Sequence, residues 1–144
     1  MENKRYILML ESDAHDRELS QNYFDAHVLP VKFLKLSNDV VPFLKEYATA
    51  LPALILLSMN SFPDKGIDVL TEVKAIDYLK HIPVILLGED TQDDLIKACY
   101  AKGASSFINK PFTTELTDVS IRSFIQYWFE VAKLPHQEAV HSKA

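Results

Sequence analysis

Five short apolar runs, separated by stretches with helical periodicity, constrain the fold of this chain more than any other feature of its sequence. The runs are residues 6–10, 31–36, 53–57, 83–87 and 105–108. Strands that alternate with helices in this way are typical of a parallel sheet covered by helices on both faces. The sequence therefore predicts one α/β domain with a doubly wound, five-stranded parallel sheet.

The run at residues 53–57 indicates which edge of the sheet carries a functional site. It is unbroken, which predicts a strand buried on both faces, and it stops at Ser58 in a polar segment that reaches Gly66. Residues after such a strand lie at the carboxyl edge of the sheet, where open α/β folds bind their ligands. The run at 6–10 is expected in the centre of the sheet. The run at 31–36 alternates apolar residues with lysines and is expected at an edge.

Start and stop signals locate the helices between these runs. Asp13 is expected to cap the first helix, which continues to about residue 27, and Gly66 is expected to open the third. Asp90 or Thr91 is expected to cap the fourth helix, which Gly103 ends.

The last helix, expected over about residues 113–131, has more apolar surface than one face can bury. The stripe expected to face the sheet consists of Leu116, Val119, Ser120, Ser123, Phe124, Tyr127 and Val131. A second apolar stripe beside it consists of Ile121, Ile125 and Trp128. Apolar surface of this extent is normally covered. The second stripe is therefore a candidate interface for a second copy or a partner protein, or it lies under the tail at 134–144. That polar tail is expected to be disordered and to follow a domain at residues 1–133.

Composition and motif spacing exclude several classes of function. A formal net charge of −5 without a block of lysine and arginine argues against nucleic-acid binding. A single cysteine allows no internal disulfide, and no apolar run is long enough for a signal peptide or a membrane span, so the cytoplasm is expected. The three glycines form no phosphate-binding loop, Ser58 lacks the flanking glycines of a hydrolase nucleophile, and the five histidines show no metal-ligand spacing. We therefore do not expect an enzyme.

The residues that follow four of the five apolar runs are polar, except for one glycine. They are Glu11, Ser12 and Asp13 after the first run, Ser58 and Asn60 after the third, Gly88 after the fourth and Lys110 after the fifth. With GASSF at residues 103–107 and KPFT at 110–113, this order resembles the receiver domain of two-component response regulators over residues 4–131. The resemblance implies a flavodoxin-like (βα)5 fold and a stand-alone receiver without an output domain.

The resemblance also implies a phosphorylation pocket in which several positions have changed. In that family two acids after the first strand and an aspartate ending the third hold Mg²⁺, and the aspartate accepts a phosphoryl group from a histidine kinase. Glu11 matches the first acid, but Ser12 stands at the second and Ser58 at the phosphoacceptor. Gly88 replaces a hydroxyl residue. Lys110 and the switch-type aromatic residue, here Phe107, are kept.

These changes predict a degenerate receiver, or pseudo-receiver, that is not phosphorylated at the standard position. Mg²⁺ is held mainly by carboxylates, and this pocket keeps only Glu11, with Asp13 as a weak further candidate. The pocket is therefore not expected to bind Mg²⁺. A serine is a weak nucleophile without a neighbouring base, and the Lys110 cation is not one. We expect a signalling adaptor that contacts a histidine kinase, an output protein or a second copy through its fourth helix, fifth strand and last helix.

Two alternatives remain open. The first is a conventional receiver that is phosphorylated on another acid, such as Asp13 or Asp64. The second is a small-molecule sensor that binds a neutral or anionic ligand beside Lys110 in the emptied pocket.

Overall fold

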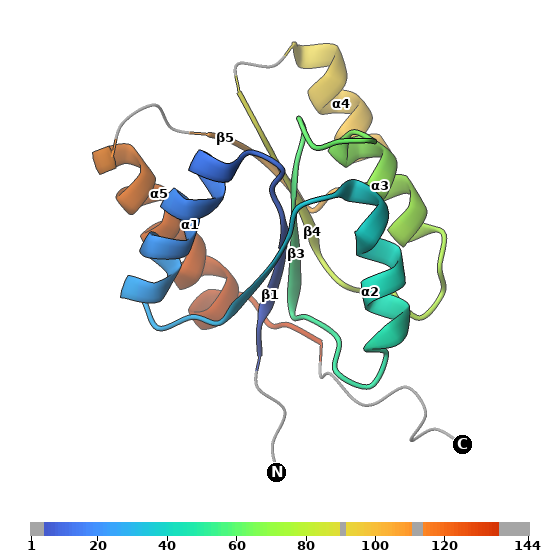
Figure 1. The fold of residues 1–144 in the computed structure, drawn as a ribbon, viewed down its shortest axis with the longest axis horizontal. Coiled ribbons are helices and arrows are strands. Elements are labelled where there is room, and N and C mark those ends of the chain that lie inside the picture. The colour runs from blue at the N-terminus through green and yellow to red at the C-terminus, as the bar shows by residue number, and fades with distance from the viewer. Residues whose placement is uncertain (1–4, 90–91, 111–113, 136–144) are drawn as a thin grey trace.

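The computed structural model describes residues 5–89, 92–110 and 114–135 of the chain, without the side chains of 114–117. Five parallel strands form one sheet in the order β2-β1-β3-β4-β5 (Figure 1). The strands are β1 Ile7–Leu10, β2 Val31–Leu34, β3 Leu54–Ser58, β4 Val84–Gly88 and β5 Ser106–Asn109. Each predicted run overlaps one strand and its boundaries agree within two residues. The central position of β1 and the edge position of β2 are confirmed.

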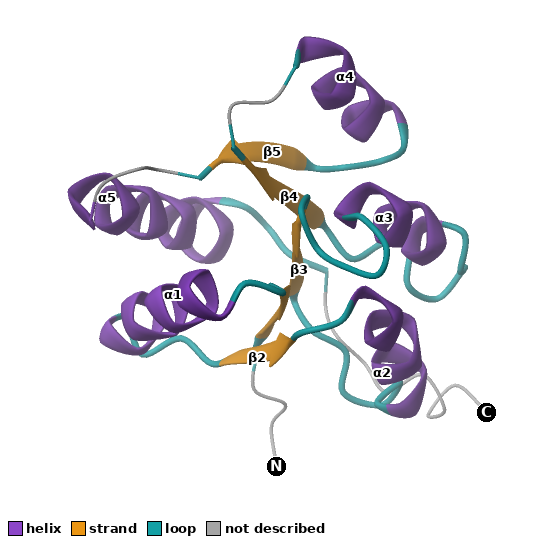
Figure 2. Cartoon of the chain, turned by 45° about the horizontal axis from the view of Figure 1, so that its top comes forward, coloured by secondary structure: helices purple, strands orange, loops and turns teal. Residues whose placement is uncertain are grey.

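The helices lie on both faces of this sheet (Figure 2). They are α1 Ala14–Ala26, the 3₁₀ turn η1 Ser37–Asp39, α2 Val40–Glu46, α3 Gly66–Lys74, α4 Asp93–Ala101, α5 Thr114–Ile125 and the π-helical turn η2 Gln126–Val131. α1 and α5 cover one face, and α2, α3 and α4 cover the other. This strand order with helices on both faces is the flavodoxin-like, doubly wound fold that was predicted.

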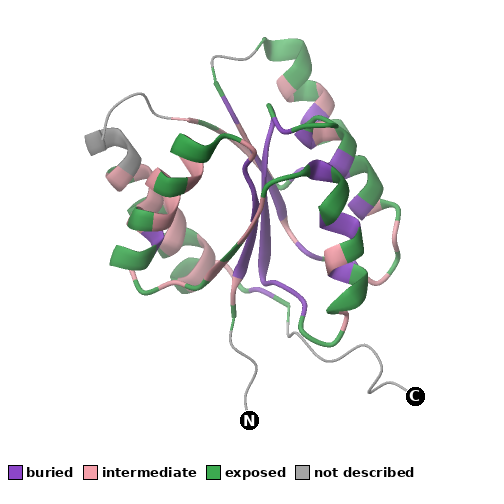
Figure 3. Ribbon diagram, viewed as in Figure 1, coloured by how far each residue is buried: buried purple, intermediate pink, exposed green. Residues whose placement is uncertain are grey.

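Two apolar layers form the core, one on each face of the sheet. Because successive side chains of a strand point to opposite faces, β1 contributes Leu8 and Leu10 to the layer under α2 and α3, and Ile7 and Met9 to the layer under α1 and α5. The central strands are buried along their length (Figure 3). This two-sided burial explains why their sequences are continuous apolar runs and do not alternate.

The predicted orientation of the last helix is wrong. Ile121, Ile125 and Trp128, expected to be a surplus stripe, pack against the core layer under α1 and α5. Val119 and Tyr127, expected to face the sheet, are exposed. The predicted arc contained two serines, which gain little from burial, whereas the arc centred on Ile121 buries larger apolar side chains. Phe124 packs on the core as predicted, and the Leu116 side chain lies outside the described residues.

The chain still packs on the core just after residue 133, the predicted end of the domain. Leu134, the first residue of the expected tail, is 4% exposed and packs in the layer under α1 and α5. The rest of the expected tail, from residue 136, lies outside the described residues.

Three of the four helix boundaries predicted from single residues are confirmed, including Gly66 as the first residue of α3. Asp13 is the N-cap of α1, where its Oδ1 accepts a 2.8 Å hydrogen bond from the Asp16 backbone N–H. Gly103 follows α4 with a φ of 108°, which favours glycine. The cap of α4 is Gln92, which makes no side-chain cap hydrogen bond. The helix therefore starts later than expected, and two acids in its first turn suit the helix dipole. Asp90 and Thr91 lie outside the described residues.

Val28, between α1 and β2, should be a site at which glycine increases stability. It is 89% exposed and has a φ of 55°, a conformation that is strained for a β-branched residue. Val28→Gly is expected to raise the free energy of unfolding by about 1 kcal/mol, because relief of the strain exceeds the entropy lost. Urea unfolding measures this. Val28→Ala, which keeps a Cβ at the same φ, is the control, and an equal gain from alanine would contradict the explanation.

Candidate functional site

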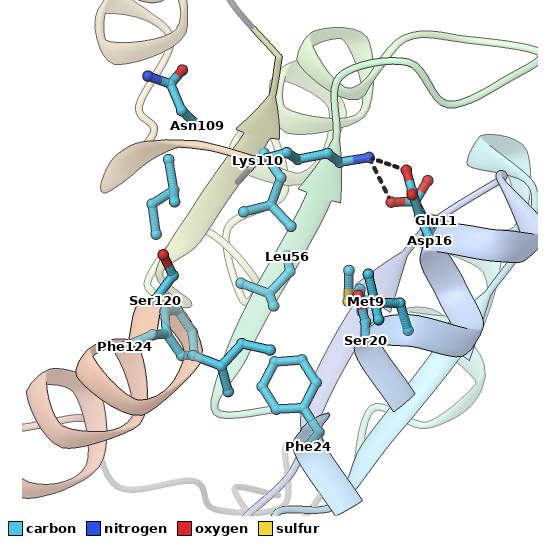
Figure 4. A pocket seen from close by; sticks show the side chains of 14 residues that line it. Met9, Glu11, Asp16, Ser20, Phe24, Leu56, Asn109, Lys110, Ser120 and Phe124 are labelled. Atoms are coloured by element: carbon cyan, nitrogen blue, oxygen red, sulfur yellow. Dashed lines mark hydrogen bonds and ion pairs between the residues drawn. The ribbon is translucent and has the colours of Figure 1, made fainter. Parts of the chain in front are cut away.

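The polar centre of the molecule is an ion-pair cluster around Lys110 at the carboxyl edge of the sheet. The Lys110 Nζ donates hydrogen bonds to Glu11 Oε1 at 2.8 Å, to Asp16 Oδ2 at 3.1 Å and to Ser58 Oγ at 3.2 Å. The two ion pairs are drawn in Figure 4. The Glu11 and Lys110 side chains are 3% and 15% exposed, and Ser58 is completely buried. We call Glu11, Asp16, Ser58 and Lys110 the lysine cluster.

Parallel strands bring these residues together. β1 and β3 pair with Leu10 opposite Leu57, so Glu11 and Ser58 end neighbouring strands at the same level. Lys110 follows β5 and reaches back toward β1 over the end of β3 and β4. Its backbone N–H donates to the carbonyl of Gly88 at the end of β4, at 2.7 Å. The sequence predicted three members of the cluster.

Asp16 was missed by the sequence prediction. It lies in the first turn of α1, three residues after the Asp13 cap, and this turn passes over the end of β1. The predicted helix start at Asp13 could have indicated this role, because it places residue 16 one turn above the end of β1. Two carboxylates therefore face Lys110, whereas the sequence indicated only one.

The charge state of Lys110 follows from this environment. Burial by itself lowers the pKa of Lys110, but the hydrogen bonds and charges of Glu11 and Asp16 outweigh burial and leave the pKa raised above its ordinary value. The ammonium has three N–H donors and uses all of them within the lysine cluster. Lys110 is therefore a fixed cation and cannot act as a base toward the Ser58 hydroxyl.

Asp13 and Ser12 turn away from the cluster. The Asp13 carboxylate is fully exposed, and hydrogen bonding from the Asp16 backbone holds the pKa of Asp13 below its usual range. The Ser12 Oγ donates to the Lys35 carbonyl at 2.6 Å and accepts from the Phe62 N–H at 3.2 Å. Ser12 thus connects the loop after β1 to the loop after β3.

Two further serines hold the same loop between β3 and α3, which includes the cis peptide Phe62–Pro63. The buried Ser37 accepts a 2.7 Å hydrogen bond at Oγ from the Asp64 N–H. The buried Ser61 donates from Oγ to the Asp64 carbonyl at 2.8 Å. We call Ser12, Ser37 and Ser61 the loop anchors. Sequence reasoning did not find this role, because it depends on contacts between loops that are distant in the chain.

Ser37→Ala should destabilise the protein by about 0.5–1.5 kcal/mol, because it removes the buried hydroxyl that accepts a hydrogen bond from the partly buried Asp64 N–H. Urea unfolding of the variant measures the loss. Ser123→Ala, at an exposed position on α5, is the matched control and should change the free energy of unfolding by less than about 0.5 kcal/mol. Equal effects of the two substitutions would contradict the anchoring role.

The remaining predicted residues lie near the lysine cluster without joining it. Asn60 is exposed in the β3–α3 loop. Gly88 is the last residue of β4 and brings no side chain to the site. Phe107 on β5 packs partly buried against the layer of α2, α3 and α4, and its backbone N–H donates to the Tyr100 hydroxyl at 3.1 Å.

The donor set does not fit the Mg²⁺ ion that the family resemblance implies. Glu11 has one oxygen on Lys110 and the other within 3.3 Å of the Asp13 N–H, and Asp13 caps α1. Among the described residues, no three Asp, Glu, His or Cys side chains are grouped so that they could hold a metal ion. Mg²⁺ requires several oxygen ligands in near-octahedral geometry, so we derive no chemistry through a metal here.

Comparison with known proteins identifies the family. No family model matches the chain. The chain is 33% identical over 86 residues to the chemotaxis protein CheY of Pseudomonas aeruginosa, covering 54% of this chain and 68% of CheY. It is 26% identical over 137 residues to the response regulator Rcp1 of Synechocystis, covering 91% and 93% of the two chains. The match to the probable methanogenesis regulatory protein FilR2 of Methanothrix harundinacea, 29% over 79 residues, spans 55% of this chain and about half, 51%, of that protein.

Solved structures agree with these relatives. The phosphorylated cyanobacterial phytochrome response regulator RcpA superposes with a TM-score of 0.84 at 27% identity, over 92% of this chain and 99% of RcpA. The Mn²⁺-bound form of Rcp1 superposes with a TM-score of 0.82 at 26% identity, over the same shares of the two chains. The chain belongs to the response-regulator receiver family.

The described part of the chain holds no helix with the length and apolar character needed to cross a lipid bilayer.

Proposed function

We propose that this receiver of two-component signalling is not phosphorylated at the end of β3 and acts through protein contacts. The observation that supports this most is the buried Ser58 hydroxyl, which accepts a hydrogen bond from the Lys110 ammonium at 3.2 Å. Ser58 occupies the position that the family resemblance assigns to the phosphoacceptor aspartate. RcpA is described as phosphorylated and Rcp1 as Mn²⁺-bound, whereas this chain has Ser12 and Ser58 at two positions where the family resemblance expects acids.

The chemistry of the site favours a silent receiver. A serine hydroxyl becomes a nucleophile when a base removes its proton, and the described partner of the Ser58 Oγ is a cation. A phosphoryl group would bring further negative charge beside Glu11 and Asp16, which already outnumber Lys110. Gly88 has no hydroxyl with which to follow a phosphoryl group, so the usual conformational switch would lack one of its parts.

The lysine cluster would replace the ionic part of the family's pocket. In this arrangement Lys110 balances the two carboxylates that remain, and the loop anchors hold the β3–α3 loop with neutral hydroxyls. The protein would then keep one conformation, in the cytoplasm, and signal by its abundance or by competition for a kinase or an output protein.

The proposed contact surface lies over α4, β5, α5 and η2. Its exposed apolar side chains are Leu95, Tyr100, Val119, Tyr127 and Val131. These replace the stripe first expected, which packs on the core. If the partner is a second copy, light scattering should give a dimer that Tyr127→Glu converts to a monomer. A monomeric wild type would exclude the second copy as the partner, leaving a kinase or an output protein.

Phosphorylation itself can be tested by incubating the protein with acetyl phosphate and Mg²⁺ and measuring its intact mass. The wild-type protein is expected to gain no phosphoryl group. The Ser12→Asp/Ser58→Asp variant, which restores the two acids of the family pattern, is the positive control and is expected to gain one labile group.

A labile gain of one phosphoryl group in the wild type would overturn the proposal. Asp13→Asn and Asp64→Asn would then identify the acceptor, since loss of labelling in either one would support the alternative that a non-standard acid is used. Asp13 caps α1, and Asp64 is exposed.

A further inference from the structure

A cavity of about 110 Å³ lies between α1 and α5, beside the lysine cluster (Figure 4). Met9 of β1 and Leu56 of β3 form its floor, and Phe24 of α1 and Phe124 of α5 lie at one end. Glu11, Asp16 and Lys110 lie at the other end. The cavity is therefore apolar along its length and charged at one end.

Small residues at matching positions of the two helices create this space. Ser20 on α1 and Ser120 on α5 both line the cavity. One turn further along each helix, Phe24 and Phe124 meet edge to face with ring centroids 6.5 Å apart. The phenylalanine pair separates the two helices at one end, and the side chains of Ser20 and Ser120 are too small to fill the gap beside it.

The polar groups of the cavity have unused hydrogen-bonding capacity. The hydroxyls of Ser20 and Ser120 make no hydrogen bond to the part of the chain that is described. Asp16 is partly exposed, and one of its oxygens binds Lys110. A ligand hydroxyl can both donate to and accept from such groups.

The charges select against an anion. Two carboxylates face one ammonium, and the ammonium already donates all three of its hydrogens. An anionic ligand beside Lys110, one of the possibilities drawn from the sequence, would therefore meet a net negative site without a free donor from the lysine.

We propose that this cavity binds a small neutral molecule with a compact apolar body, such as one aromatic ring, and a single hydroxyl. The apolar body would lie on Met9 and Leu56, and the hydroxyl would bond to Ser20, Ser120 or Asp16. The cavity volume of about 110 Å³ is below the roughly 150 Å³ of an apolar protein cavity that binds benzene, so the apolar body is limited to at most one ring. The cavity also lies over β1 and β3, where the strand order of this fold reverses and where such folds commonly bind ligands.

Phenol is the test ligand, and benzoate, which has the same ring with a negative charge, is its matched control. Phenol titration should cause saturable chemical-shift changes in the methyl groups of Met9, Leu56 and Ile108, and benzoate should bind at least about tenfold more weakly. Absence of saturable shifts with phenol, or equal binding of benzoate, would overturn the proposal.

Variants that fill the cavity provide the second arm. Ser120→Ile should weaken phenol binding at least about tenfold by occupying the space, whereas Ser123→Ile, at an exposed position of the same helix, should leave it unchanged. If Ser120→Ile fails to fold, Ser20→Ile fills the cavity from α1 and carries the same expectation. Unchanged phenol binding in a folded filling variant would contradict the site. Phenol binding needs neither a phosphoryl group nor a protein partner, so its outcome is independent of the proposed function.

Discussion

Replacing Lys110 by methionine is expected to lower the free energy of unfolding by about 3–5 kcal/mol, because it leaves the buried Glu11 carboxylate without its cation. Glu11 is 3% exposed, and its Oε1 lies 2.8 Å from the Lys110 Nζ. The loss can be measured by urea denaturation, with circular dichroism as the probe of folding.

Lys97→Met is the matched control for this prediction. Lys97 pairs with Asp93 at 3.3 Å, but the two side chains are 75% and 78% exposed, so removal of this pair should cost less than about 0.5 kcal/mol. The double variant Glu11→Gln/Lys110→Met should recover part of the loss, since it removes the uncompensated charge. A cost for Lys110→Met equal to that for Lys97→Met would mean that the ion pairs do not hold the site together.

Gly66→Ala is expected to destabilise the protein by about 1–3 kcal/mol through close contact with the backbone. A Cβ at this position would lie 2.5 Å from the Ser58 carbonyl oxygen and 3.2 Å from a methyl group of Leu86. The start of α3 therefore presses directly on the end of β3, and only glycine allows the approach. Thermal or urea unfolding measures the effect.

The exposed position Glu72 on the same helix provides the control, because Glu72→Ala removes no packing and should change stability by less than about 0.5 kcal/mol. The shift of the Ser58 carbonyl should also change the amide chemical shifts of the lysine cluster in Gly66→Ala. A variant as stable as the wild type, with unchanged shifts around Ser58, would contradict the close approach.

Much of the fold was predictable from the sequence, because the strands are buried on both faces. Burial of this kind requires unbroken apolar runs, and each run ends where the chain leaves the core. The positions of Glu11, Ser58 and Lys110 at one edge then follow from the parallel arrangement alone, since every strand ends at the same side of the sheet.

The position of Asp16, the loop anchors and the orientation of the last helix depend on how separate elements pack. Such packing is only weakly indicated by the sequence. Asp16 joins Lys110 because α1 crosses over the end of β1, and the helical pattern does not give that crossing. Ser12 and Ser37 hold a loop that lies 50 and 27 residues further along the chain. The last helix carries two apolar stripes. The stripe around Ile121 packs on the core because its apolar side chains are larger.

The central claim is that Lys110, and not a divalent cation, balances the carboxylates of this receiver. Titration of the protein with Mn²⁺, followed by NMR line broadening, tests it most directly. The wild-type protein is expected to have no saturable Mn²⁺ site near the lysine cluster, and the Ser12→Asp/Ser58→Asp variant is expected to gain one. Stoichiometric broadening of the wild-type signals of Glu11, Ser58 and Lys110 would contradict the claim.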